Sequence, residues 1–134
     1  MIQPFLVFSG WAILFLRVVV GIILVAHGLP KLKNLQKTVQ GFEGMGFKPG
    51  IFWGTLVGVL EFVGGIALML GLFTQVIAVL VVIQFMVILL KVKRGAPLVG
   101  GYEFDLLILA AAVALATLGS GFVSLERLFS IVVY

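Results

Sequence analysis

Residues 51–90 contain a single charged side chain, Glu61. An α-helix rises about 1.5 Å per residue, so a helix of this length would measure about 60 Å, enough to cross the roughly 30 Å hydrocarbon core of a bilayer twice. Residues 71–75 interrupt the run with a glycine and two polar side chains. The sequence therefore predicts a transmembrane helical hairpin, in which any function depends on the few polar groups inside the membrane.

Two further apolar runs flank this hairpin. Residues 5–28 carry only Arg17 as a charge, and residues 106–125 carry none. With 63% hydrophobic and 10% charged residues, the chain lacks the charged surface of a soluble domain. The runs are also too long and too continuously apolar for strands of a transmembrane barrel. We therefore predict an all-α polytopic membrane protein, a four-helix bundle forming a single domain over residues 1–134, with spans at about 4–27, 51–70, 74–90 and 102–118.

A short helix is predicted between the first two spans. The first span is expected to end at Gly28-Leu29-Pro30, because proline has no N–H and the residue before it disfavours the helical region. Within residues 31–42, four apolar side chains recur at helical spacing, opposite lysines and glutamines: Leu32, Leu35, Val39 and Phe42. This pattern is typical of a helix at the membrane interface.

Lysine and arginine are distributed unevenly between the two sides of the membrane. The connections after the first and third spans hold seven of them, Lys31, Lys33, Lys37, Lys48, Lys91, Lys93 and Arg94, and the opposite side has only Arg127. The positive-inside rule therefore places both basic loops in the cytoplasm and both termini outside, in the cytoplasmic membrane. The lipid bilayer is the expected partner. A nucleic acid is not, because no basic and aromatic surface lies outside the spans.

The sequence contains no cysteine and one histidine, His27. Without cysteine the chain cannot form a disulfide, an iron–sulfur cluster or a cysteine-type zinc site, and one histidine cannot hold a bis-histidine haem. No metal site is predicted. A bound quinone is the cofactor that the sequence leaves open.

Three polar side chains fall near the middle of the first three predicted spans: Arg17, Glu61 and Gln84. A lone charge at the bilayer centre costs several kcal/mol, so we expect Arg17 to pair with Glu61 and Gln84 to complete their hydrogen bonds. Two interpretations stay open, a structural ion pair that fixes helix register and a cavity wall that binds a polar headgroup or relays a proton. A third is that Arg17 extends to the membrane surface.

A second polar group is expected at the cytoplasmic ends of the first and fourth spans, where His27, Lys31, Glu103 and Asp105 fall at similar depth. Imidazole changes charge readily near neutral pH, and a neighbouring carboxylate would stabilise its cation. We predict that these side chains line the mouth of a pocket that leads toward Glu61. The alternative is an ordinary interfacial histidine with acidic residues at the rim.

Several short motifs occur in an order similar to that of a known family. They are Arg17 with Gly21, His27-Gly28 with Lys31, Met45-Gly46, Glu61-Phe62-Val63-Gly64-Gly65, Leu70-Gly71-Leu72-Phe73-Thr74, Tyr102-Glu103 and the run from Gly119 to Glu126. Together they resemble the DoxX family of small four-helix membrane proteins over nearly the whole chain, although Glu126 stands where the family more often has Asp. The resemblance implies a link to redox metabolism, since relatives include the membrane subunit of thiosulfate:quinone oxidoreductase and partners of soluble oxidoreductases.

Three functions are open on the sequence alone. The first is a membrane subunit of an oxidoreductase, which binds a quinone-like or other small polar-headed molecule at the Arg17–Glu61–Gln84 layer and docks a soluble redox partner. The second is a small-molecule or proton transporter, for which four short helices leave room only if the chain forms a homodimer. The third is a structural membrane scaffold with no chemistry of its own. We favour the first, and whether such a subunit is itself catalytic stays open.

Overall fold

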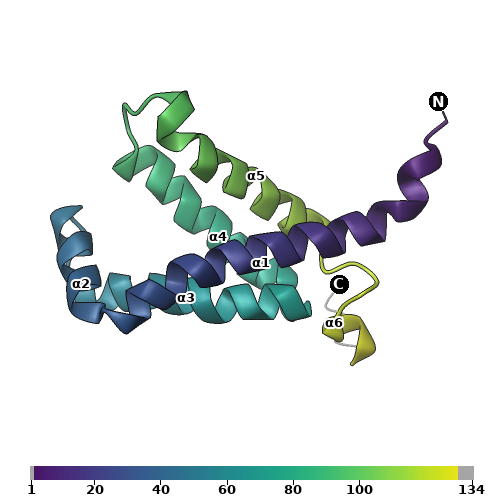
Figure 1. Ribbon diagram of the computed structural model, residues 1–134, viewed down its shortest axis with the longest axis horizontal. Coiled ribbons are helices and arrows are strands. Elements are labelled where there is room, and N and C mark those ends of the chain that lie inside the picture. The colour runs from purple at the N-terminus through teal and green to yellow at the C-terminus, as the bar shows by residue number, and fades with distance from the viewer. Residues whose placement is uncertain (1, 130–134) are drawn as a thin grey trace.

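The computed structural model describes residues 2–129 (Figure 1). Its elements, with η marking short 3-10 or π-helices, are η1 (Pro4–Phe8), α1 (Ser9–Lys33), α2 (Leu35–Gly44), α3 (Gly50–Leu70), α4 (Thr74–Val87), η2 (Ile88–Val92), η3 (Leu98–Tyr102), α5 (Glu103–Leu118) and α6 (Leu125–Leu128). Four continuous helical segments are long and apolar enough to cross a membrane: Pro4–Lys33, Gly50–Leu70, Thr74–Val92 and Leu98–Leu118. The described residues contain no strand. The predicted all-α polytopic bundle is thus confirmed, and the third and fourth spans extend further toward their shared loop than expected.

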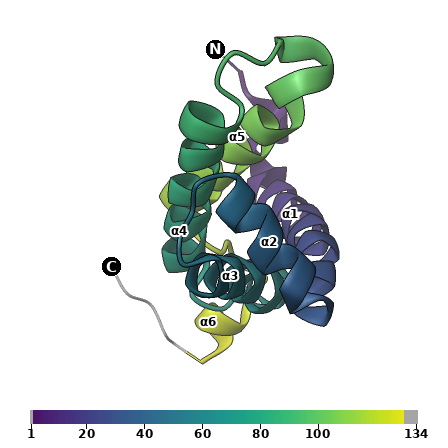
Figure 2. The same cartoon turned by 90° about the vertical axis from the view of Figure 1, so that its left-hand side faces the viewer.

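The long helices form two pairs that cross at an angle (Figure 1). α1 packs along α3 and α4 along α5, while α2 packs against one end of α3 (Figure 2). Buried apolar side chains from all four long helices meet in one core: Val20, Leu24, Leu68, Ala78, Val81, Phe85, Ile108, Ala112 and Leu115. A polar side chain that enters this core must find its partner inside the bundle, because the surroundings are apolar.

The bundle has two distinct ends. At one end lie α2 and the connection between η2 and η3, and there Lys91 Nζ is 4.4 Å from the centre of the Phe47 ring. We call this the lysine-rich end. The α3–α4 turn and α6 lie at the other end, which we call the α6 end (Figure 1). The two basic connections therefore share one end, as the charge distribution predicts.

Glycines bring α1 and α3 into close contact. A Cβ atom on Gly21 would lie 2.6 Å from the carbonyl oxygen of Gly65, and one on Gly28 would lie 2.5 Å from the backbone nitrogen of Phe62. Neither position has room for a side chain in this register, and small residues allow such close packing of membrane helices. The contacts set the last turns of α1 beside the middle of α3, where the functional site is found.

The predicted end of the first span is wrong, because α1 continues through Pro30 to Lys33. A proline in the last turn of a helix removes one backbone donor but does not prevent the next residues from being helical. Packing favours the continuation, since the Leu32 side chain lies against α3, 2.9 Å from where a Cβ of Gly58 would be. The extra turn carries Lys31 along α3.

The predicted short helix between the first two spans is present as α2. It begins after Asn34, whose Oδ1 accepts a hydrogen bond from the Lys37 backbone N–H at 3.2 Å, a typical N-cap. Thr38 and Phe42 then lie over Gly54, so one face of α2 packs on α3. The position of α2 at the membrane interface stays a prediction.

The chain after α5 folds back over the α3–α4 turn. Ser124 caps α6 by accepting from the Arg127 backbone N–H at 3.3 Å. Glu126 attaches the segment at two points: its backbone N–H donates to the Gly71 carbonyl at 3.0 Å, and its Oε1 accepts from the Thr74 backbone N–H at 2.6 Å. The α6 end is therefore closed by a segment distant in sequence from the helices it covers.

The membrane orientation can be tested by cysteine labelling, since the chain has no cysteine of its own. We expect an impermeant thiol reagent to label Leu128→Cys on intact cells but to label Lys33→Cys and Arg94→Cys only after permeabilisation. All three side chains are exposed, so access to the reagent depends on the side of the membrane. The reverse pattern would place the lysine-rich end outside.

Candidate functional site

Glu61 lies in α3 and is only 4% exposed. Both of its carboxylate oxygens have protein partners, because Lys31 Nζ is 2.5 Å from Oε2 and Gln84 Nε2 donates to Oε1 at 2.6 Å. The expected contact between Gln84 and Glu61 is confirmed. The cation that neutralises Glu61 is Lys31, at the end of α1.

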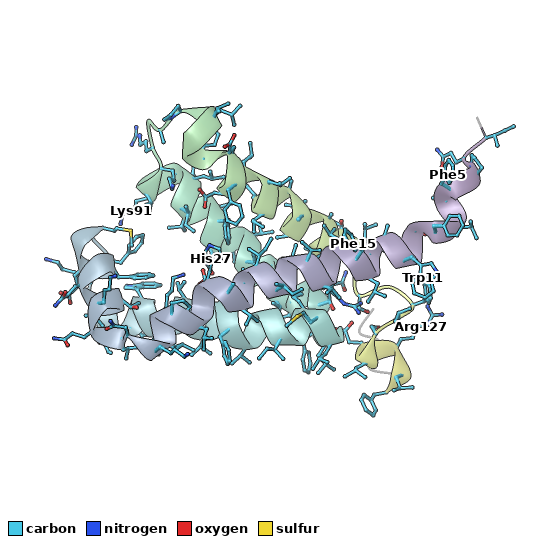
Figure 3. All side chains as sticks on the ribbon, viewed as in Figure 1. Phe5, Trp11, Phe15, His27, Lys91 and Arg127 are labelled. Carbon is cyan, nitrogen blue, oxygen red and sulfur yellow. The ribbon has the colours of Figure 1, made fainter. Side chains whose placement is uncertain are left out.

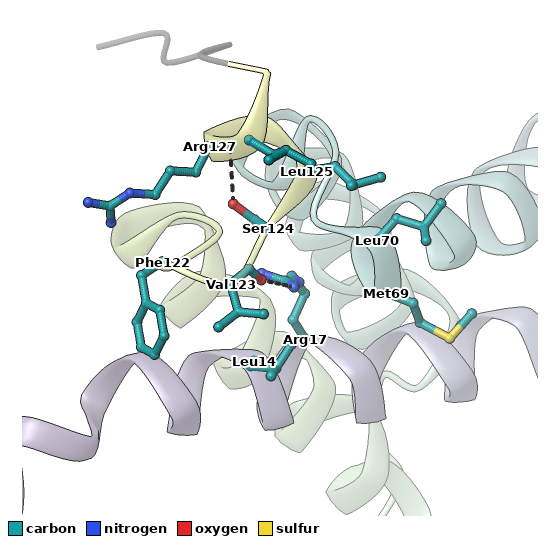
Figure 4. Close-up of a pocket in the computed structure, with 10 residues that line it drawn as sticks. Leu14, Arg17, Met69, Leu70, Phe122, Val123, Ser124, Leu125 and Arg127 are labelled. Atoms are coloured by element: carbon teal, nitrogen blue, oxygen red, sulfur yellow. Dashed lines mark hydrogen bonds between the residues drawn. The ribbon is translucent and has the colours of Figure 1, made fainter.

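The predicted pairing of Arg17 with Glu61 is wrong. Arg17 is 1% exposed, and its guanidinium donates to two backbone carbonyls of the segment after α5. One is that of Ser120, and the other is that of Val123, at 2.6 Å (Figure 4). A Cβ on Gly71 would lie 2.9 Å from Arg17 Cζ, so Arg17 is level with the α3–α4 turn. Glu61 precedes Gly71 by ten residues, or about 15 Å of helix.

Arg17 does not reach Glu61 because α1 and α3 are offset along their lengths. The glycine contacts place the middle of α1 beside the end of α3, and the first turns of α1 extend past the bundle (Figure 1). The middle of a predicted span therefore does not mark the middle of the membrane for both helices. Because Arg17 is buried by the C-terminal segment, it does not reach the surface either.

A cavity of about 300 Å³ opens beside Glu61 at the lysine-rich end, and we call it the Lys31–Glu61 pocket. Its lining consists of Lys31, Glu61, His27, Lys93, Asp105 and Phe104, with Ile23, Leu24, Phe85, Ile88 and Gly101. Charged groups thus occupy part of the wall, and apolar side chains occupy the rest. Such a mixture is common in sites for small molecules that have a polar head and an apolar body.

His27 extends from α1 into this pocket (Figure 3). Its Nδ1 donates to the Ile23 carbonyl oxygen at 2.8 Å, and its ring stacks on Phe104 with centroids 5.6 Å apart. A carbonyl can only accept, so the proton of the neutral ring is assigned to Nδ1, and Nε2 keeps a lone pair. His27 can therefore accept a proton at Nε2 or, once charged, donate one there.

The structure brings together three of the four side chains that were expected at the mouth of the pocket. His27, Lys31 and Asp105 line it together with Glu61, but Glu103 lies outside and accepts a hydrogen bond from the backbone of the preceding turn. The sequence reasoning missed Lys93, whose Nζ is 3.7 Å from Asp105 Oδ2. The signal was available, because Lys93 directly follows the third span, at the end of the bundle where the fourth span begins with Asp105 in its first turns. The difference between Glu103 and Asp105 is one of helix rotation, since two residues turn a helix by about 200°.

Within residues 2–129, no three His, Cys, Asp or Glu side chains are grouped so that they could hold a metal ion. What the pocket offers instead is hydrogen bonding: an ammonium donor on Lys31, a carboxylate on Glu61 and an imidazole nitrogen on His27. The pocket is thus equipped to bind a polar group and to exchange protons with it.

Residues 12–94 match the family model described as DoxX. The chain belongs to the DoxX family. The match includes His27, Lys31, Glu61 and Lys93, so most of the polar lining of the pocket lies in the matched part of this DoxX protein.

Two relatives are similar over most of their length. The DoxX chain is 35% identical to the Bacillus subtilis (strain 168) protein named "Putative oxidoreductase CatD" over 113 residues, which cover 84% of this chain and 83% of that protein. It is 29% identical to "Uncharacterized membrane protein Rv3486" of Mycobacterium tuberculosis, covering 89% of this chain and 82% of the relative. No solved structure matches the chain significantly.

Proposed function

We propose that this DoxX protein is the membrane subunit of an oxidoreductase system and binds the head of a quinone-like molecule in the Lys31–Glu61 pocket. The observation that carries the proposal is the pocket itself, in which Lys31 and His27 face the same cavity as the aromatic side chains Phe85 and Phe104. The oxidoreductase name of the Bacillus subtilis relative supports the same reading.

The pocket chemistry suits a ring that carries carbonyl oxygens. A carbonyl of the ring accepts a hydrogen bond from the Lys31 ammonium, and the flat ring packs against Phe104 and the neighbouring apolar wall. Reduction of a quinone to a quinol takes two electrons and two protons. We assign the two electrons to the reduced cofactor of a soluble partner and both protons to Nε2 of His27, which donates one proton to the ring, takes up another from water, since the side chain is exposed, and donates that one in turn.

The soluble partner would dock at the lysine-rich end. Exposed cations gather there on α2 and on the two basic connections: Lys33, Lys37, Lys48, Lys91 and Arg94. Such a surface favours a partner with an acidic face, because complementary charge raises the rate of association and sets its orientation.

Binding of soluble quinone analogues tests this proposal. We expect decyl-ubiquinone or 2,3-dimethyl-1,4-naphthoquinone to bind the purified protein saturably. At a pH where the His27 ring is charged and donates from Nε2 to the second carbonyl, His27→Phe should weaken binding about tenfold, the effect of losing one good hydrogen bond. Phenylalanine keeps the stacking on Phe104, so the variant removes the ring nitrogens and little else. Isothermal titration calorimetry in a neutral detergent measures the Kd.

Gln75→Met serves as the matched control. Gln75 is exposed and donates to the Ala116 carbonyl at 3.0 Å, toward the α6 end, so its replacement should leave the Kd unchanged. If neither quinone binds the wild type, the buried Lys31–Glu61 pair is better read as a contact that fixes helix register. Equal binding by wild type and His27→Phe would place the quinone elsewhere.

A further inference from the structure

A second cavity lies at the α6 end, opposite the Lys31–Glu61 pocket, and the proposed function does not use it. Its volume is about 670 Å³, and it opens between α1, the end of α3 and α6 (Figure 4). The polar part of its lining consists of Arg17, Ser124 and Arg127, and the apolar part includes Leu14, Leu70 and Leu128.

Arg17 has donors that the protein does not use. A guanidinium carries five N–H groups, and the described residues supply Arg17 with the two carbonyls of Ser120 and Val123. Its Nε is buried and has no acceptor. Within residues 2–129, no carboxylate lies at ion-pair distance from Arg17. A buried cation that has no carboxylate at ion-pair distance is stabilised when another anion binds nearby.

The position of the cavity indicates which anion is available. Arg17 is level with the α3–α4 turn, and a turn between two membrane spans lies where the hydrocarbon core gives way to lipid headgroups. Lipid phosphates are therefore present at this depth. Leu70 and Leu128 on the cavity wall are exposed, as expected of side chains that contact acyl chains.

Charge favours an acidic lipid over a neutral one. Arg127 projects from α6 at the rim of the cavity (Figure 4). Arg17 and Arg127 together carry two positive charges, and Glu126 supplies one negative charge to this end of the bundle. The resulting surplus of one positive charge attracts a headgroup of net negative charge.

We propose that this cavity is a binding site for an anionic phospholipid. The phosphate accepts hydrogen bonds from Arg127 at the rim and is attracted by the positive charge of Arg17, which is buried behind the cavity wall, and an acyl chain lies along Leu14, Leu70 and Leu128. The bound lipid would join α6 to α1 and α3, the elements that form the cavity.

The test uses the full chain in a neutral detergent. We expect phosphatidylglycerol to raise the Tm and to stay bound in native mass spectrometry, whereas phosphatidylcholine and inorganic phosphate leave the Tm unchanged. Arg127→Gln should weaken the binding of phosphatidylglycerol about tenfold, the effect of losing a charge-assisted hydrogen bond. The Arg127 side chain is exposed, so this variant should fold normally.

Arg94→Gln is the matched control, because Arg94 is exposed at the lysine-rich end and the same charge is removed there. It should bind phosphatidylglycerol as the wild type does. An equal loss in both arginine variants would mean that the lipid binds through general charge attraction, and no loss in Arg127→Gln would also overturn the proposal. Equal stabilisation by phosphatidylcholine would rule out a charge-selective site, and equal stabilisation by inorganic phosphate would identify a site for free anions.

Discussion

Replacing Lys31 with methionine should lower the free energy of unfolding by about 3–5 kcal/mol, the cost of leaving one partner of a buried ion pair uncompensated. The Glu61 carboxylate would stay in a site only 4% exposed, with Gln84 as its one remaining partner. Glu61→Gln should cost less, because the Lys31 side chain is 27% exposed and can turn its charge toward water. The double variant should recover most of the loss, since it removes both charges together.

A double-mutant cycle measured by chemical unfolding in detergent checks this expectation. Lys31 and Glu61 should show a coupling energy of about 2 kcal/mol or more, whereas Arg17→Met combined with Glu61→Gln should be additive within about 0.5 kcal/mol. The second pair is the control, because Arg17 and Glu61 share no partner in the structure. Strong coupling between Arg17 and Glu61 would contradict the observed register of α1 on α3.

Replacing Arg17 with methionine should release the segment after α5 from the bundle and lower the free energy of unfolding by about 3 kcal/mol. Each of the two hydrogen bonds that the guanidinium donates, to Ser120 and to Val123, contributes about 1.5 kcal/mol. Amide hydrogen exchange gives the local readout. The Glu126 N–H, which donates to Gly71, should exchange faster in the variant.

Arg17→Lys distinguishes the effect of the positive charge from the effect of the hydrogen-bond geometry of the guanidinium. Lysine keeps the positive charge but presents a single ammonium, which cannot match the forked contact to two carbonyls. We therefore expect an intermediate loss of stability and an intermediate rise in exchange. Unchanged exchange at Glu126 in the methionine variant would show that Arg17 does not hold the segment. Exchange near Glu61 should be the same in all three proteins, because that site lies toward the other end of the bundle.

Local features of the sequence were enough to predict the four helices, the turn after Leu70 and the contact between Gln84 and Glu61. The apolar composition indicates segments that lie in lipid, where no water can pair with the backbone. Such segments form helices, since each backbone N–H and C=O must be paired within the segment. In a hairpin, residues at equal distances from the turn lie side by side. Glu61 and Gln84 are nearly equidistant from the turn at residues 71–73, so chain connectivity places them at similar depth, where they meet.

The tertiary structure alone decided which cation reaches Glu61. α1 and α3 are joined by a long connection that contains α2, so connectivity does not set their register. The register depends on the glycine contacts and on the continuation of α1 past Pro30, and it brings Lys31 to Glu61 while Arg17 lies at the α6 end. The sequence showed that the buried charge of Glu61 must be paired. The lengthwise offset of α1 and α3 determined that its partner is Lys31.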